Sequence, residues 1–175
     1  MIKGDNQVRS VFIWVSEGTW RAGVDAAVGL APAGARFTLL HVTSAEAPEV
    51  AHGAYAGLLG RADQDPGDRL EEMADVSAGA LLEAAARRLG RGCEKLEIQA
   101  HGHAERAVVS ACAHADLLIV ARDGDRARLG PKSLGKTTRF VVDHAACPVL
   151  LVWPASAPDV ATIPPPPPHG HPPDR

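Results

Sequence analysis

Hydrophobic residues along the chain fall into five short runs that alternate with stretches of helical periodicity. The runs cover residues 8–15, 36–42, 95–100, 116–121 and 148–152. Two of them, 116–121 and 148–152, are almost continuously apolar, which is typical of strands covered on both faces. The run at 95–100 is the most polar of the five, and this composition predicts a strand nearer to a sheet edge.

Helical spacing of apolar residues appears over residues 19–30, 68–89, 105–115 and 136–146. The longest stretch opens with Asp68 and Glu71 in a capping-box-like arrangement, and Gly90 predicts its end. Strands that alternate with helices require crossover connections and a parallel sheet. The pattern therefore predicts a single α/β domain over residues 7–154, with a doubly wound five-stranded parallel sheet and helices on both faces.

Two segments depart from this alternation. Residues 45–67 form an insertion without a clear period, which predicts a loop or lid over the strand ends. The chain from Pro154 onward holds nine of the fourteen prolines, so residues 155–175 are expected to form a disordered, proline-rich tail. His169 and His171 in that tail would bind a metal only weakly.

Overall charge and composition exclude several classes of partner. A net charge of −3 and an isoelectric point near 6.2 give no reason to expect nucleic-acid binding. No apolar run approaches the length of a membrane span, and the first one is too short for a signal peptide. Three cysteines without metal-ligand spacing indicate reduced thiols. A cytoplasmic protein without a membrane or nucleic-acid partner is the expectation.

Residues 130–137, GPKSLGKT, match the Walker A pattern of nucleotide hydrolases. A working loop of this kind leaves a buried strand directly, and a later strand supplies an acidic residue for Mg²⁺. Here the preceding strand ends at Ala121, and the one remaining strand ends in Pro154. The match is therefore read as accidental. His101 and His103 flank Gly102, and they are interpreted as part of a turn rather than as metal ligands.

The segment 116–152 combines an apolar strand, a basic glycine-containing loop, a helix and the closing sequence HAACPVLLV. This arrangement resembles the universal stress protein family, and the resemblance extends over about residues 7–154. It implies a strand order of 3-2-1-4-5 and a homodimer formed through the last strand, Val149–Val152. One branch of the family binds ATP at the carboxyl ends of the strands, through a loop of the form G-x-x-G, nine residues, then G-[ST].

The chain keeps only part of that loop motif. Ala121 occupies the position of the first glycine of the motif, and Gly124 matches the second. Gly135 matches the third glycine, but it follows Gly124 after ten residues instead of nine. Lys136 replaces the hydroxyl residue, although Thr137 comes next. The resemblance implies that these five positions would surround a nucleotide's phosphates.

Two further positions carry over from the family. Ser16 falls at the end of the first strand, where nucleotide binders usually have an aspartate. Val42, near the end of the second strand, fits the position whose backbone lies beside adenine. Against binding, Asp123 brings a carboxylate to a place where binders often have a basic residue, and it would repel phosphates.

Charge in the loop favours the opposite conclusion. Residues 122–139 hold six lysines and arginines against two aspartates, beside an expected helix N-terminus that attracts anions. Two readings stay open. The first is a non-enzymatic stress-response regulator that binds ATP or AMP, with Mg²⁺ accompanying ATP. The second is a nucleotide-free dimeric module with an unknown protein partner; weak ATP hydrolysis is a minor alternative.

Overall fold

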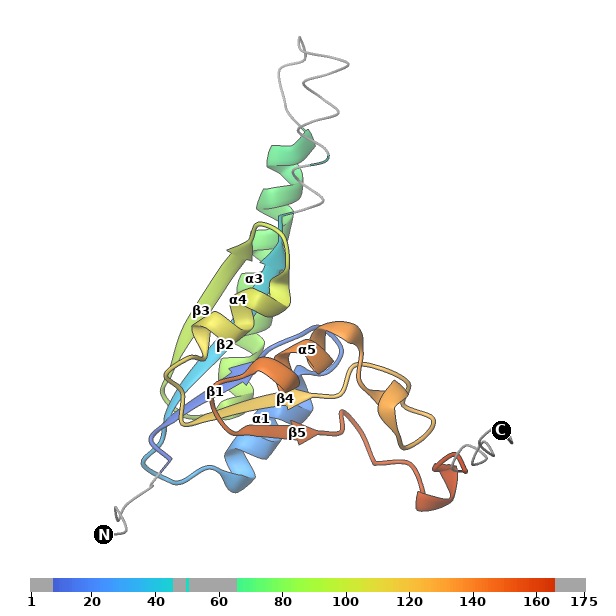
Figure 1. The fold of residues 1–175 in the computed structure, drawn as a ribbon. Coiled ribbons are helices and arrows are strands. Elements are labelled where there is room, and N and C mark those ends of the chain that lie inside the picture. The colour runs from blue at the N-terminus through green and yellow to red at the C-terminus, as the bar shows by residue number, and fades with distance from the viewer. Residues whose placement is uncertain (1–7, 46–49, 51–65, 166–175) are drawn as a thin grey trace.

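Strands and helices alternate along the chain, as the sequence pattern predicts (Figure 1). The computed structural model describes residues 8–45, residue 50 and residues 66–165. The described elements, in chain order, are β1 (Ser10–Trp14), α1 (Trp20–Leu30), β2 (Arg36–Ser44), α3 (Pro66–Leu89), β3 (Cys93–Ala100), α4 (Ala104–Ala111), β4 (Leu117–Ala121), the 3-10 helix η1 (Pro131–Ser133), α5 (Lys136–His144), β5 (Val149–Val152) and the 3-10 helix η2 (Val160–Thr162).

All strand pairs are parallel, and the order across the sheet is β3-β2-β1-β4-β5. This is the order implied by the resemblance, and it places the polar strand β3 at an edge, as its composition predicts. Along the chain, β2 and β3 are added on one side of β1, and β4 and β5 are added on the other. The direction of winding therefore changes between β1 and β4.

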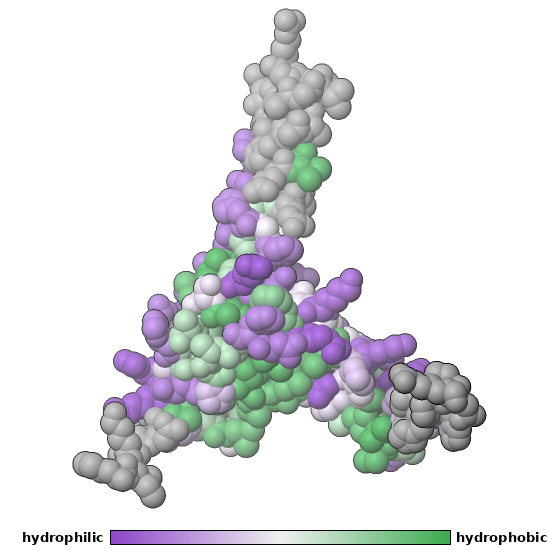
Figure 2. Space-filling view, viewed as in Figure 1, coloured by the Kyte–Doolittle hydropathy of each residue, from purple (hydrophilic) through white to green (hydrophobic). Residues whose placement is uncertain are grey.

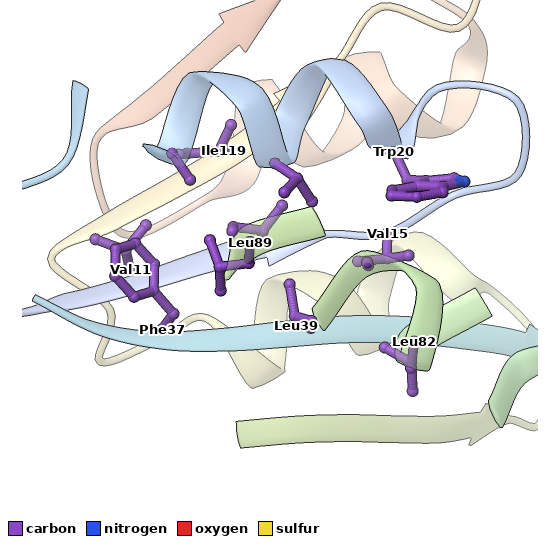
Figure 3. Close-up of a cluster of buried hydrophobic side chains, with 12 residues drawn as sticks. Val11, Val15, Trp20, Phe37, Leu39, Leu82, Leu89 and Ile119 are labelled. Atoms are coloured by element: carbon purple, nitrogen blue, oxygen red, sulfur yellow. The ribbon is translucent and has the colours of Figure 1, made fainter. Parts of the chain in front are cut away.

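Side chains on the two sides of the sheet form separate cores, because successive strand residues point to opposite faces. On one face, sheet residues such as Val11 and Leu39 pack under α1 and α3, together with Trp20 and Leu82 (Figure 3). On the other face, sheet residues including Leu118 pack under α4 and α5. The predicted three-layer α/β architecture is confirmed.

Strand β5 differs from the sequence expectation in its exposure. Its four apolar residues are each only partly buried, whereas four of the five residues of β4 are buried. The reason is position: β5 is an edge strand, so one side of its backbone and the flanks of its side chains lack a neighbouring strand. Figure 2 shows apolar surface over the region of β5 and α1 on this face, and Leu30 at the end of α1 is 68% exposed.

Helix boundaries are close to the predicted ones, with two differences. Helix α3 begins at Pro66, so Asp68 lies in its first turn instead of capping it, and Gly90 ends it with a φ of +63°. Helix α4 ends at Ala111, four residues before the predicted end. The following residues turn toward β4 through hydrogen bonds from the Ala113 and Ala115 amides to the carbonyls of Ser110 and Cys112.

The first part of the expected tail is described by the structure. Residues 155–165 follow β5 and include η2, in which the Asp159 side chain accepts a hydrogen bond from the Ala161 amide at 2.7 Å. The Leu129 amide donates to the Thr162 hydroxyl at 3.0 Å, which ties this segment to the loop after β4. Residues 166–175, with the two tail histidines, and almost all of the 45–67 insertion lie outside the described residues.

Candidate functional site

The candidate site lies at the carboxyl edge of the sheet, where β1, β2 and β4 end side by side. In doubly wound sheets, ligands bind outside the carboxyl ends of the strands, at the point where the winding direction changes. Ser16 follows β1, and Ala121 is the last residue of β4, so these two residues flank that point. Val42 lies on the neighbouring strand β2, beyond the last residue pair that β1 and β2 form. The fold therefore brings the three predicted strand-end residues to one edge.

The end of β1 is fixed by backbone contacts that also start α1. The Ser16 carbonyl accepts hydrogen bonds from the amides of Thr19 at 3.2 Å and Trp20 at 3.1 Å. The Val15 carbonyl accepts from His41 Nδ1 at 2.7 Å. His41 thereby joins the ends of β1 and β2.

The loop between β4 and α5 folds back on itself. The Gly124 amide donates to the Ser133 carbonyl at 3.0 Å, and the Asp125 amide donates to the Lys132 carbonyl at 2.8 Å. A Cβ added at Gly124 would lie 2.3 Å from the Lys132 carbonyl oxygen. Gly124 is therefore required by the packing of the loop itself.

Ser133 is the buried centre of this loop. Its hydroxyl donates to the Gly130 carbonyl at 2.7 Å and accepts a hydrogen bond from the Arg122 guanidinium. That guanidinium also lies over the ring of Trp153, 4.7 Å from the centroid. The start of the loop is thus held to its end and to the residue that follows β5. Neither contact carries a motif that sequence analysis could recognise.

Segment 130–137 does not have the geometry of a P-loop. Gly130 has a φ of +129° and precedes η1, so a 3-10 turn, not a direct strand-to-helix connection, fills the segment. Lys136 is the first residue of α5 and is exposed, and Thr137 beside it is partly buried. The accidental nature of the Walker A match is supported by this geometry.

Asp123 and Gly135 meet at the start of α5. The Gly135 amide donates to Asp123 Oδ1 at 2.7 Å. A Cβ at Gly135 would lie within 2.9 Å of three atoms of that carboxyl group. Gly135 therefore makes room for an internal carboxylate. The sequence marked Asp123 as unfavourable for phosphates but gave no sign of this contact, because the two residues are twelve positions apart.

Most of the cations in the loop contact protein groups. Arg128 Nε lies 3.4 Å from Asp125 Oδ2, and the Arg139 guanidinium donates to the Pro131 carbonyl. The Arg126 guanidinium lies 3.5 Å from the Gly18 carbonyl, in the turn between β1 and α1. Among the described residues, no polar partner is found for the exposed ammonium groups of Lys132 and Lys136.

Two other features singled out in the sequence lie away from this loop. Gly102 has a φ of +102°, which confirms the turn after β3, and His103 Nδ1 lies 3.3 Å from Glu105 Oε1. Within the described parts of the chain, no group of three histidine, cysteine, aspartate or glutamate residues could hold a metal ion. The same parts contain no helix with the length and apolar character needed to cross a bilayer.

The three cysteines lie in apolar surroundings. Burial raises the pKa of Cys112 to about 12 and raises the pKa of Cys93 and of Cys147 as well. Their thiols are therefore protonated and poor nucleophiles at neutral pH.

A parallel sheet whose winding reverses between β1 and β4, with a glycine-containing basic loop at that reversal, defines a doubly wound α/β protein, a class in which ligands bind at such a reversal. The family model described as the universal stress protein family matches residues 16–152. The chain belongs to the universal stress protein family.

Solved structures show the same fold. UspA from Lactobacillus plantarum is 17% identical, with a TM-score of 0.55 and coverage of 83% of this chain and 98% of the other. A universal stress protein in complex with cAMP is 18% identical, with a TM-score of 0.55 and coverage of 85% and 99%. A family protein from Arabidopsis thaliana with AMP bound is 18% identical, with a TM-score of 0.53 and coverage of 89% and 95%. No curated protein matches the chain.

Proposed function

We propose that the chain is a non-enzymatic stress-response regulator that binds an adenine nucleotide at the carboxyl edge of its sheet. The observation that carries this proposal is the convergence of Ser16, Val42 and Ala121 beside the loop that ends at Gly135. Val42 would lie along the adenine, Ser16 and Ala121 would line the crevice, and the Gly135–Thr137 segment would face the phosphates. Structural neighbours described with cAMP and with AMP support the ligand class.

A binding role is favoured over a catalytic one by the groups at this edge. His41 donates from Nδ1 to the Val15 carbonyl, a contact that ties the ends of β1 and β2 together, and no activated nucleophile accompanies it in the described part of this edge. The thiols have raised pKa values and lie in the two cores. ATP or AMP is the candidate ligand, with Mg²⁺ accompanying ATP; hydrolysis is not part of the proposal.

Calorimetric titration of AMP and of ATP with Mg²⁺ tests the proposal, with Gly135→Asp as the disrupting variant. An aspartate at position 135 has no room beside Asp123 and adds a second negative charge at the phosphate end. Gly34→Asp is the matched control, because a Cβ at Gly34 meets nothing within 4 Å and the residue precedes β2, at the opposite edge of the sheet. We expect binding in wild type and Gly34→Asp, and its loss in Gly135→Asp.

The result that contradicts the proposal is the absence of heat together with an unchanged melting temperature at millimolar nucleotide. A ligand at about a hundred times its Kd stabilises the folded state by about 2.7 kcal/mol, which a melting curve detects. Such a result would favour the second candidate function, a nucleotide-free module that binds a protein partner. The internal contact between Asp123 and Gly135 is the observation that favours this alternative.

Both functions include a homodimer through β5. An edge strand with four apolar residues and no charge is a site for pairing with another strand, and its partial exposure is consistent with a partner. Leu150→Lys places a charge on this edge, and we expect it to convert a dimer into a monomer in sedimentation equilibrium. An unchanged dimer would place the interface elsewhere, and a monomeric wild type would remove the dimer from the proposal.

A further inference from the structure

The amide nitrogen just before α5 already has an anionic partner within the chain. The first amide groups of a helix lack intrahelical acceptors, and they commonly bind phosphate or carboxylate oxygens. Here Asp123 Oδ1 lies 2.7 Å from the Gly135 nitrogen. The second carboxylate oxygen is equally close to the point where a Cβ of Gly135 would be. The whole carboxylate therefore lies against the residue to which the proposed function assigns the phosphate end of the ligand.

The backbone on each side of Asp123 is anchored. The Arg122 amide donates to the Val152 carbonyl at 2.9 Å, which extends the pairing of β4 with β5. The Gly124 amide donates to the Ser133 carbonyl. The Asp123 side chain itself is exposed, so a rotation about its own side-chain bonds can remove the carboxylate without moving the loop.

Few cations of the loop are free to make direct contacts with a polyphosphate. The arginines of the loop contact Ser133 and Trp153, Gly18, Asp125 and Pro131. Only Lys132 and Lys136, among the described residues of the loop, have ammonium groups without a polar protein partner. A phosphate that approaches Gly135 must therefore displace Asp123 or lie beside it, where two like charges repel each other.

We propose that Asp123 determines ligand specificity as an internal anion that nucleotide phosphates must displace. The crevice then prefers adenine ligands with little phosphate charge, such as adenosine, cAMP or AMP, over ATP. This inference rests on the proposed function, because it concerns the phosphate end of the same site. The number of basic residues in the loop would suggest a preference for the more highly charged ATP, and the inference reverses this preference.

The experiment is titration of adenosine, cAMP, AMP and ATP into wild type, Asp123→Asn, Asp123→Ala and Asp143→Asn. Asparagine keeps an oxygen for the Gly135 amide but removes the charge, and alanine removes both. Asp143 is an exposed residue in the last turn of α5, so Asp143→Asn makes the same change in net charge far from Gly135. Circular dichroism and thermal unfolding confirm that each variant is folded.

We expect wild type to bind AMP at least about tenfold more tightly than ATP, a difference of about 1.4 kcal/mol. Asp123→Asn and Asp123→Ala should raise ATP affinity about tenfold and leave adenosine affinity unchanged, and Asp143→Asn should leave both unchanged. Equal affinities for AMP and ATP in wild type would overturn the inference. The inference would also be overturned if both Asp123 variants kept the wild-type ratio of AMP affinity to ATP affinity. A similar rise in ATP affinity in Asp143→Asn would overturn it as well.

The outcomes separate this inference from the proposed function. If wild type binds none of the four ligands and Asp123→Asn binds ATP, Asp123 excludes phosphates but the wild-type chain is not a nucleotide sensor. If wild type binds AMP and ATP equally well, the proposed function stands and the role of Asp123 is rejected. If neither wild type nor any variant binds a ligand, both are rejected.

Discussion

Gly124 offers a direct test of the way in which the loop after β4 is packed. Substitution by alanine adds one methyl group at a point where it would lie 2.3 Å from the Lys132 carbonyl oxygen and 2.7 Å from the Ser133 carbonyl carbon. Both atoms belong to the backbone, so no side-chain rotation relieves the overlap. The two sides of the loop must separate, and the hydrogen bonds of the Gly124 and Asp125 amides to the opposite side weaken.

The size of the effect follows from these contacts. Each backbone hydrogen bond contributes about 1 kcal/mol net, and overpacking of a well-fitted site costs about 1–3 kcal/mol. Replacement of glycine by alanine also restricts the unfolded chain, which favours folding by about 0.4–1 kcal/mol. The φ of Gly124 is not positive, so no backbone strain is added. We expect Gly124→Ala to lower the free energy of unfolding by about 1–3 kcal/mol.

Urea unfolding monitored by tryptophan fluorescence measures this difference, with Gly79→Ala as the control. Gly79 lies within α3, and an added Cβ there meets nothing within 4 Å, so alanine should stabilise the protein by about 0.5–1 kcal/mol. Limited trypsin digestion reports on the loop itself, because Arg126 and Arg128 should become cleavage sites when the loop opens. A Gly124→Ala protein as stable and as resistant to trypsin as wild type would refute the described packing.

Three other predictions follow from single contacts. The Asp116 carboxylate accepts hydrogen bonds from the amides of Arg9 and Ser10, and these bonds lower the pKa of Asp116. The ionised carboxylate therefore stabilises the folded protein above the pKa that Asp116 has in the unfolded chain. This stabilisation is lost as the pH falls through the pKa of Asp116 in the folded protein. Asp116→Asn should lower the urea midpoint at pH 7, and this difference should shrink as the pH falls below the ordinary pKa of 3.8; a difference that stays constant as the pH falls further would contradict this. The Cys112 thiol, with its pKa raised to about 12, should react with a thiol reagent at pH 8 only after unfolding, and rapid native labelling would contradict its burial. Thr162→Val removes the acceptor of the Leu129 amide and should accelerate hydrogen exchange at Leu129, whereas unchanged exchange would show that the tail does not protect it.

The order of elements could be predicted from the sequence because each element carries its own periodicity. The positions of β1, β2 and β4 follow from apolar runs, and the edge position of β3 follows from its polar composition. The end of α4 could not be read, because residues 112–115 continue the helical pattern without a glycine or proline. The chain leaves the helix there because it has to reach β4, which is a requirement of the tertiary structure.

The ends of the strands can also be predicted from the sequence, so the placement of Ser16, Val42 and Ala121 at one edge of the sheet follows from the predicted order of strands. The interior of the loop is not readable in this way. The contact of Arg122 with Ser133 and that of the Leu129 amide with Thr162 join residues that belong to no recognisable motif, over 11 and 33 positions. The Asp159-to-Thr162 turn does carry a local signal, since aspartate commonly caps a short turn through its side chain, but the stretch of prolines that follows it dominated the prediction.

The loop also shows why a count of charges overstates an anion site. A guanidinium that binds backbone carbonyls or packs on an aromatic ring still carries its charge, but it is oriented toward the protein and lies where the loop needs it. In this chain, such contacts hold Arg122 and Arg139, while Asp123 lies against the amide that a phosphate would use. Most of the cationic groups of the loop therefore stabilise the folded loop through contacts within the protein. In the specificity that we propose, a ligand makes direct contacts with free cations of the loop only where it reaches Lys132 and Lys136, and Asp123 then favours a weakly charged adenine ligand over a triphosphate.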